Sequence, residues 1–259
     1  MLKKAEEIYA YREMIKSLVK KDLRGRYKSS FLGFLWTFIN PLCQIIIYTI
    51  VFSVIMRSGI EKFYLFLIVG MIPWLFFSSS ISSGSVSVVS QQDLVKKIFF
   101  PREVLPIAFV TSCFINMLFC FVIVFVVVGI SGIGFSAKAL LFLPFVMIVE
   151  YIMALGITMI TSACTVYVRD LEHIMGIITM AWIYMTPIMY SIDMVPESIR
   201  PVFYANPMTP IITAYRDILY YKRCPDMKML LYALFLGVII SVSGFFIFNR
   251  LQKNFVEEL

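Results

Sequence analysis

Long apolar stretches separated by short polar loops determine what this 259-residue chain can fold into. The hydrocarbon core of a bilayer is about 30 Å thick, and a helix needs about 20 predominantly apolar residues to cross it. Six stretches fit this requirement: 33–56, 63–81, 104–131, 139–167, 174–190 and 229–248. We therefore predict an all-α membrane protein with six transmembrane helices. The fifth stretch is short and carries Pro187, so we expect a kink or an early end there.

The composition excludes a water-soluble domain. Sixty per cent of the residues are apolar and only 15% are charged, and a soluble fold of this length has no interior large enough for so much apolar surface. Residues 1–30 are densely charged where a secretory signal would be apolar, so we expect the first apolar stretch to remain as a span. The five cysteines form no CxxC site and indicate no disulfide framework.

The distribution of Lys and Arg predicts the orientation. Fifteen of the 23 lie in the segments 1–32, 91–103, 168–173 and 249–259. The other eight lie in 57–62, at Lys138 and in 191–228. Because basic loops stay in the cytoplasm, we predict a multi-pass protein of the bacterial plasma (inner) membrane with both termini cytoplasmic. The net charge of +7 then indicates topology and contact with anionic lipid, and nucleic-acid binding is not expected.

Residues 1–30 have the pattern of a surface helix. Apolar side chains recur at helical spacing at Ile8, Tyr11, Ile15, Leu18, Val19, Leu23 and Tyr27. The other side of the helix carries Lys4, Lys16, Lys20 and Lys21. This pattern predicts an amphipathic helix along the membrane surface. The alternative, a solvated charged tail, explains the charges but not the apolar stripe.

The segment before the last span is rich in proline, with Pro196, Pro201, Pro207, Pro210 and Pro225. Prolines at this spacing divide a chain into short helices and turns. We predict short re-entrant helices that dip into the outer leaflet. The whole chain is then a single transmembrane domain: an interfacial helix (1–30), spans one to five (33–190), an external segment (191–228), span six (229–249) and a cytoplasmic tail (250–259).

Motifs for catalysis or nucleotide binding are absent. The chain has no GxxxxGK[ST] loop, no DxD pair and no GxSxG elbow, so we expect no enzyme activity and no bound cofactor. Its single histidine, His173, follows Asp170 and Glu172 in a short loop, where a solvated turn is favoured over a metal site. Work done by this protein must be driven by another subunit.

Several short motifs resemble the permease subunits of ABC polysaccharide exporters, the family that moves lipid-linked O-antigen, capsule, rhamnan and teichoic acid chains. The similar positions are Asp22-Leu23, Arg26-Tyr27-Lys28, Ser30, Leu32-Gly33, Leu35-Trp36, Pro41, Lys97, Phe100-Pro101, Leu105-Pro106, Arg169-Asp170, Asn206-Pro207-Met208-Thr209-Pro210, Tyr215-Arg216, Phe248, Arg250 and Phe255. They extend over nearly the whole chain. Only Lys222-Arg223 and Cys224 stand out as departures.

The resemblance implies a homodimer of six-helix permeases with two copies of a separate ABC ATPase subunit and a lipid-linked glycan as cargo. A single six-helix bundle is also too small to enclose a wide channel. The alternatives are a permease that exports a drug, another small molecule or a lipid, a membrane-embedded glycosyltransferase or acyltransferase, and a non-transporting scaffold for cell-wall assembly. The missing acidic pairs and catalytic histidine argue against a transferase.

Aromatic rings are the natural contacts for the C–H faces of sugars. The resemblance implies that the first and fifth spans line the path, and these carry Phe34, Trp36, Phe38, Trp182, Tyr184 and Tyr190. The alternative is an interfacial belt, because Trp and Tyr also collect at membrane surfaces. Glu150 lies near the middle of the fourth stretch and is expected to face other helices or the water path. A structural hydrogen bond to Tyr151 or Thr158 is the alternative role.

Two short cytoplasmic loops are the predicted contacts with the ATPase, and the resemblance implies that they are its coupling helices. The 91–103 loop is expected to combine a charged pair with an exposed apolar pair and a proline: Lys96, Lys97, Phe99, Phe100 and Pro101. The 168–173 loop offers Arg169, Asp170 and Glu172 for ion pairs. Exposed aromatic residues ringed by charge indicate a protein interface. The alternative is that both phenylalanines belong to the interfacial start of the third span.

Overall fold

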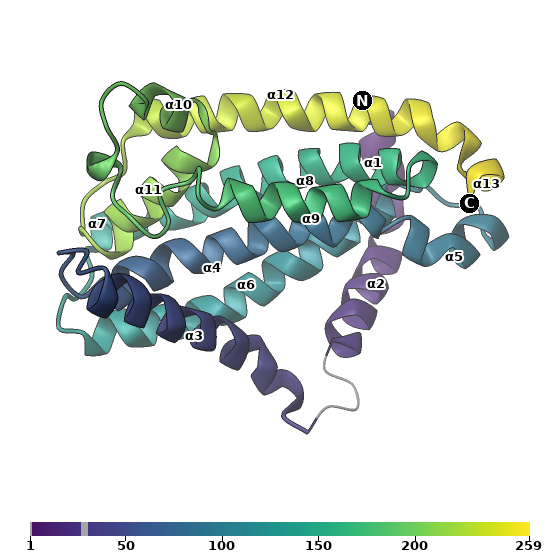
Figure 1. Cartoon of the computed structure of the whole chain (residues 1–259). Helices are drawn as coiled ribbons and strands as arrows, with labels where there is room; N and C mark the ends of the chain where they lie inside the picture. Colours follow the sequence, from purple (N-terminus) through teal and green to yellow (C-terminus); the bar gives the residue numbers. More distant parts are fainter. Residues whose placement is uncertain (1, 27–30) are drawn as a thin grey trace.

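The computed structural model describes residues 2–26 and 31–259, and in those ranges its regular elements are all helices, without a strand (Figure 1). Five of its helical segments are long and apolar enough to cross a membrane: Gly33–Ile55, Phe63–Val86, Val104–Ile130, Ala137–Tyr167 and Met227–Glu258. They correspond to the first four predicted spans and the last. The predicted all-α, multi-pass membrane fold is therefore confirmed.

The helices that form these spans are α3 (Trp36–Thr49), α4 (Phe63–Ser82), α6 (Val104–Ile130), α8 (Leu143–Tyr167) and α12 (Met227–Leu251). Helix α3 contains Pro41 and is continued by a π-helical stretch, Ile50–Ile55. The remaining differences from the predicted bounds are a few residues at each end.

The predicted fifth span differs most from the structure. Helix α9 covers Leu171–Trp182, and residues 183–190 follow as turns and bends. Twelve helical residues at 1.5 Å each extend about 18 Å, which is too short to cross a bilayer. Pro187 has no backbone N–H to donate and its ring hinders helical continuation, which accounts for the early end. A continuous span over 174–190 is thus absent, and the count of six spans stays a prediction.

The N-terminal segment is not one helix but two, α1 (Leu2–Ala10) and α2 (Arg12–Gly25), which are joined at Tyr11. The predicted apolar face is confirmed on α2, where Ile15 and Leu18 pack against the bundle and Val19 is buried. The part of the predicted helix and of the similar motifs at residues 27–30 lies outside the described residues.

The bundle has two ends with different contents (Figure 1). One, which we call the terminal end, carries α5 (Gln92–Lys97), the turn at 168–170 and the C-terminal helix α13 (Phe255–Glu258). The opposite end, the loop end, carries α7 (Ala137–Leu140), α10 (Arg200–Ala205) and α11 (Met208–Leu219). This is the grouping of loops that the distribution of basic residues predicts.

Helix α4 is the centre of the bundle, with 78% of its most apolar window buried against 6% for the first span. It contacts α3, α6, α8, α9 and α11. The predicted short helices before the last span are present, but α11 is more deeply placed than a surface loop. Nearly all of its residues are buried against α4, α8 and α12.

Helices α8 and α12 pack closely against each other, because glycines let their backbones approach. A Cβ atom at Gly156 would lie 2.6 Å from the backbone nitrogen of Ser241, and one at Gly244 would lie 2.4 Å from the carbonyl oxygen of Gly156. The Ser241 hydroxyl donates a hydrogen bond of 2.8 Å to the Ile152 carbonyl across the same seam. Small residues that permit this approach are the usual contact between membrane helices.

Gly156→Ala should therefore separate α8 from α12. Overpacking of this kind costs roughly 1–3 kcal/mol, so we expect a clearly lower midpoint when thermal unfolding of the detergent-solubilised protein is followed by size-exclusion chromatography. Gly176→Ala in α9 is the matched control, because a Cβ there meets no atom within 4 Å. Equal midpoints for the two variants would contradict the role assigned to this seam.

Candidate functional site

The structure places the two phenylalanines of the predicted apolar pair in the 91–103 loop in different environments. Phe99 is 94% exposed, whereas Phe100 is only 5% exposed and packs with Val95, Phe248 and Phe255 in a small core at the terminal end. The prediction of two exposed phenylalanines was wrong for Phe100. The segment is extended at Ile98, so successive side chains point to opposite sides and only one ring faces outward.

The other predicted contact residues lie at the terminal end as expected. Lys96 and Lys97 are exposed on the last turn of α5, where Lys97 lies 3.5 Å from Asp93, and Pro101 is half-buried. The polar side chains of the turn between α8 and α9 and of the first turn of α9 are also exposed: Arg169, Asp170, Glu172 and His173. Helix α13 contacts both α5 and α8, so the two loops flank the C-terminal helix.

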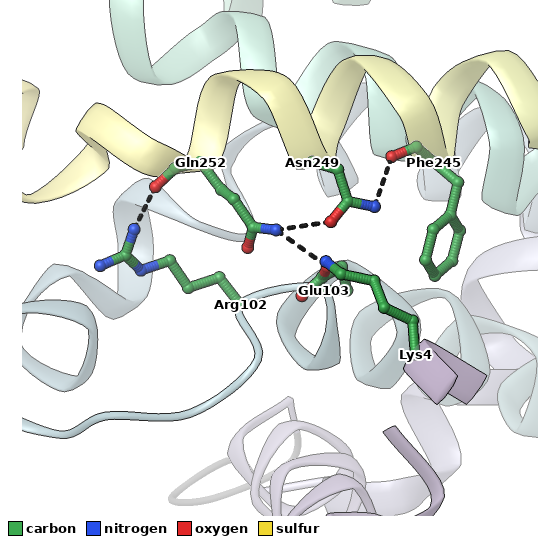
Figure 2. A network of polar contacts seen from close by, with 6 residues as sticks. All are labelled: Lys4, Arg102, Glu103, Phe245, Asn249 and Gln252. Carbon is green, nitrogen blue, oxygen red and sulfur yellow. Dashed lines mark hydrogen bonds and ion pairs between the residues drawn. The ribbon is translucent and has the colours of Figure 1, made fainter. Parts of the chain in front are cut away.

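A buried acid that the sequence analysis did not single out organises this end. Glu103 is 1% exposed and forms an ion pair with Lys4 of α1. Its Oε1 also accepts a hydrogen bond of 2.9 Å from Gln252, which in turn donates to Asn249 at 2.8 Å (Figure 2). Arg102 donates to the Gln252 carbonyl. The first helix, the start of α6 and the end of α12 are therefore joined through one carboxylate.

A groove of about 950 Å³ lies beside this network, between α1, residues 98–103 and the end of α12. Phe99 forms part of its wall, and Arg102, Arg250 and Lys253 supply positive charge. An exposed aromatic ring beside a basic groove is the kind of surface that receives a segment of a partner protein.

Glu150 is fully buried in α8 and faces α11. Its Oε2 accepts a hydrogen bond of 2.7 Å from the hydroxyl of Tyr215. The two hydroxyls named in the sequence analysis are used elsewhere: Tyr151 pairs with Thr111, and Thr158 donates to backbone carbonyls. The acid thus faces another helix, and within a single chain its contact is structural.

The six predicted path aromatics form two separate groups. Phe34 and Phe38 pack edge to face at 5.3 Å between ring centroids, and Trp36 lines a polar pocket between α3, α4 and α6. In the second group Trp182 packs against Phe77, and the Tyr190 hydroxyl donates to the carbonyl of Tyr184 at 2.6 Å. Among the described residues no ring contact joins the groups within one chain, so their role as a path stays a prediction.

The break after α9 leaves backbone carbonyls without helical partners, and two side chains from the proline-rich segment satisfy them. Arg216, 3% exposed, donates to the carbonyls of Pro187 and Ile188, the latter at 2.5 Å, and its guanidinium lies 3.5 Å from the ring centre of Phe66. Asn206 donates to the Met185 carbonyl at 3.0 Å.

Asn206 also begins α11, because its Oδ1 accepts from the backbone N–H of Met208 at 3.0 Å, two residues before Pro210. The same oxygen accepts from the indole N–H of Trp182 at 3.0 Å. Asn206 and Arg216, the first and last residues of the motif 206–216, therefore hold the turn at 183–190. These contacts give both ends of the motif a structural role.

Lys222 and Arg223, which depart from the resemblance described above, lie after α11 and outside the spans, and both have structural contacts. Lys222 donates to the carbonyl of Ile133 at 3.1 Å, and Arg223 forms an ion pair of 2.7 Å with Asp217. Burial raises the pKa of the Asp217 carboxyl, an effect that the hydrogen bond from Arg223 opposes. Cys224 is exposed. Across the described residues no cluster of three or more His, Cys, Asp and Glu side chains is suited to a metal.

Sequence signals for the missed residues existed but were weak. Glu103 directly precedes a 27-residue apolar helix, where an acid next to a helix N-terminus is commonplace. Gln252 follows Glu103 by 149 residues, and Lys4 precedes it by 99. Only the fold brings the three side chains together. Arg216 was identified as part of a motif, but its burial was not predicted.

Comparison with known proteins agrees with this architecture. A family model described as "ABC-2 type transporter" matches residues 13–220. An O-antigen export system permease protein RfbA from Myxococcus xanthus is 33% identical over 261 residues, which cover 100% of both chains. A protein of the same name from Klebsiella pneumoniae is 33% identical and covers 95% of each chain. The polysialic acid transport protein KpsM from Escherichia coli is 23% identical, covering 78% of this chain and 80% of its own.

A substitution that replaces only the side-chain nitrogen of Asn206 by oxygen tests the role of this residue. Asn206→Asp keeps the oxygen that caps α11 but removes the N–H donors to Met185 and Thr186, and it buries a charge. We expect a loss of roughly 1–3 kcal/mol in stability and faster protease cleavage after residue 183. Asn254→Asp, at an exposed position beside α13, is the matched control. Equal cleavage of both variants would show that Asn206 does not hold the turn.

Proposed function

We propose, because the chain belongs to the ABC-2 type transporter family, that it is the membrane permease subunit of an exporter for a lipid-linked polysaccharide. The observation that carries the proposal is the full-length similarity to permeases named for O-antigen export. The similarity to a polysialic acid transport protein supports a polysaccharide as the class of cargo, of the O-antigen, capsule, rhamnan or teichoic acid kind.

ATP hydrolysis is assigned to a separate subunit. The chain lacks a phosphate-binding loop, so the energy for export must reach it through a protein contact. The terminal end supplies that contact. Phe99 is its exposed aromatic residue, the basic groove beside it provides charge, and Asp170 stands on the neighbouring turn. The terminal end is then the cytoplasmic face of the plasma membrane, as the excess of basic residues also predicts.

The permease works as a homodimer with two ATPase subunits. The first span supports this arrangement, because only 6% of its apolar window is buried within one chain. A second copy would cover part of this surface and place two sets of Phe34, Trp36 and Phe38 along a shared path. Phe34 and Trp36 are 44% and 45% exposed within one chain.

Deleting the gene tests the cargo. We expect the lipid-linked polymer to accumulate in the cytoplasm while the surface loses the same polymer, and mass spectrometry of extracted lipid-linked glycans identifies it. Complementation with the wild-type gene is the control. A strain that retains its surface polymer and accumulates no lipid-linked glycan would exclude this function.

The ATPase contact predicts a separate loss. Phe99→Ser removes a single exposed ring, and aromatic residues of this kind contribute about 2 kcal/mol or more to binding, so we expect at least about 30-fold weaker ATPase association. Asp170→Arg should also reduce association by reversing charge. Phe100 is unsuited to this test because its burial makes any polar substitution a folding defect.

Co-purification of the tagged permease with its ATPase measures the effect. Met194→Ser, which truncates an apolar side chain that is 53% exposed at the loop end, is the matched control and should retain the ATPase. Since the ATPase lies in the cytoplasm, the experiment also tests the orientation. Normal association of both Phe99→Ser and Asp170→Arg would show that the ATPase binds elsewhere.

A further inference from the structure

A polar pocket of about 300 Å³ lies between the first three spans. Helices α3, α4 and α6 supply most of its walls, and the end of α2 supplies its edge. Its polar and aromatic lining residues include Arg26, Trp36, Asn40, Gln44, Ser79 and Asn116. The volume is at the lower limit of the about 300–1,000 Å³ typical of small-molecule sites.

The pocket lies at a depth in the bilayer where polar side chains have a high free-energy cost. Gln44 lies at the midpoint of the span Gly33–Ile55, and Asn116 lies close to the midpoint of Val104–Ile130. Polar groups at that depth are costly unless they face other polar groups or water, and they mark the paths of polar substrates. Two amides from different spans at the same depth, both lining one cavity, indicate a site rather than packing.

The amides of α3 are available to a ligand. Asn40 and Gln44 are one helical turn apart and both line the cavity. Neither makes a hydrogen bond to any other residue in the described part of the chain. A carboxamide donates through its NH₂ and accepts through its oxygen, which suits the paired donor and acceptor character of neighbouring hydroxyl groups.

Arg26 links the pocket to the terminal end. It forms an ion pair of 2.9 Å with Asp22 and lies 3.2 Å from the sulfur of Cys113, nine residues inside the third span. It also lines a second cavity of about 480 Å³ that extends to Ser90 and Gln91 near α5. Polar side chains therefore continue from the terminal end to the middle of the spans.

We propose that the pocket between α3, α4 and α6 is a subsite for a sugar unit of the exported glycan, a statement that rests on the function proposed above. Asn40 and Gln44 hydrogen-bond the sugar hydroxyls, and the ring of Trp36 packs against a C–H face. Arg26 is neutralised by Asp22, so the site favours hydroxyl groups over a phosphate. A lipid tail would leave the amides unsatisfied, which excludes it as the occupant.

Tryptophan fluorescence gives a direct readout, because the chain has only three tryptophans. The double variant Trp74→Phe and Trp182→Phe leaves Trp36 as the reporter, in full-length protein reconstituted in lipid nanodiscs. The probe is a set of short oligosaccharides released by mild acid from the surface polysaccharide of the organism that carries the gene. We expect a saturable change in Trp36 emission and no saturable change when Trp74, which does not line the pocket, is the only tryptophan.

The pocket variants separate binding from packing. In the Trp36 reporter, Asn40→Leu and Gln44→Met should each weaken oligosaccharide binding about five- to tenfold, as expected for one lost hydrogen bond. Cys43→Leu is the matched control on α3, because Cys43 is exposed and does not line the cavity, and it should bind normally.

Two results would overturn the subsite. One is unchanged Trp36 emission at saturating oligosaccharide. The other is loss of the dimer, seen by size-exclusion chromatography with light scattering, in Asn40→Leu and Gln44→Met but not in Cys43→Leu, which would make these amides subunit contacts. Either result with normal polymer accumulation in the deletion strain rejects only the subsite. Absence of accumulation rejects the proposed function itself.

Discussion

The backbone carbonyls of Met185, Pro187 and Ile188 are the groups on which the loop end depends. They leave the helical ladder at the end of α9, and a bilayer or a protein interior offers no water to satisfy them. Asn206 and Arg216 supply the donors instead. Arg216 is itself held by the ring of Phe66 in α4, and its neighbour Tyr215 is bonded to Glu150 in α8. One break in a short helix therefore connects α4, α8, α9 and α11, which explains why α11 is buried.

The sequence predicts the fold well where the signal is local. The apolar stretches of the first four predicted spans and of the last one match the structure, because lipid imposes a similar length on every crossing helix. The apolar face of α2 follows from helical spacing alone. At residues 174–190 the early end that Pro187 predicts is present, but its position at Trp182 is not predictable, since composition counts apolar residues and cannot locate a turn that a distant arginine stabilises.

The candidate contact with the ATPase is predicted only in part for the same reason. Phe99 and Phe100 are adjacent and chemically identical, so nothing in the sequence distinguishes the ring that faces outward from the ring that packs against Phe248 and Phe255. Both of these phenylalanine partners come from the last fifth of the chain. The amides at positions 40, 44 and 116 are similarly unremarkable in two separate apolar stretches, and only the fold directs them into one cavity.

The carboxylate of Glu103 has a mechanical consequence. It holds α1 through Lys4 and the end of α12 through Gln252, and it immediately follows the exposed segment that carries Phe99. We therefore expect a displacement imposed on Phe99 to be shared by the first and last helices. Because α12 packs closely against α8 at the glycine seam, we expect these two spans to move together as one arm. The α3 span, which packs weakly against the rest, is left as the element against which this arm can move.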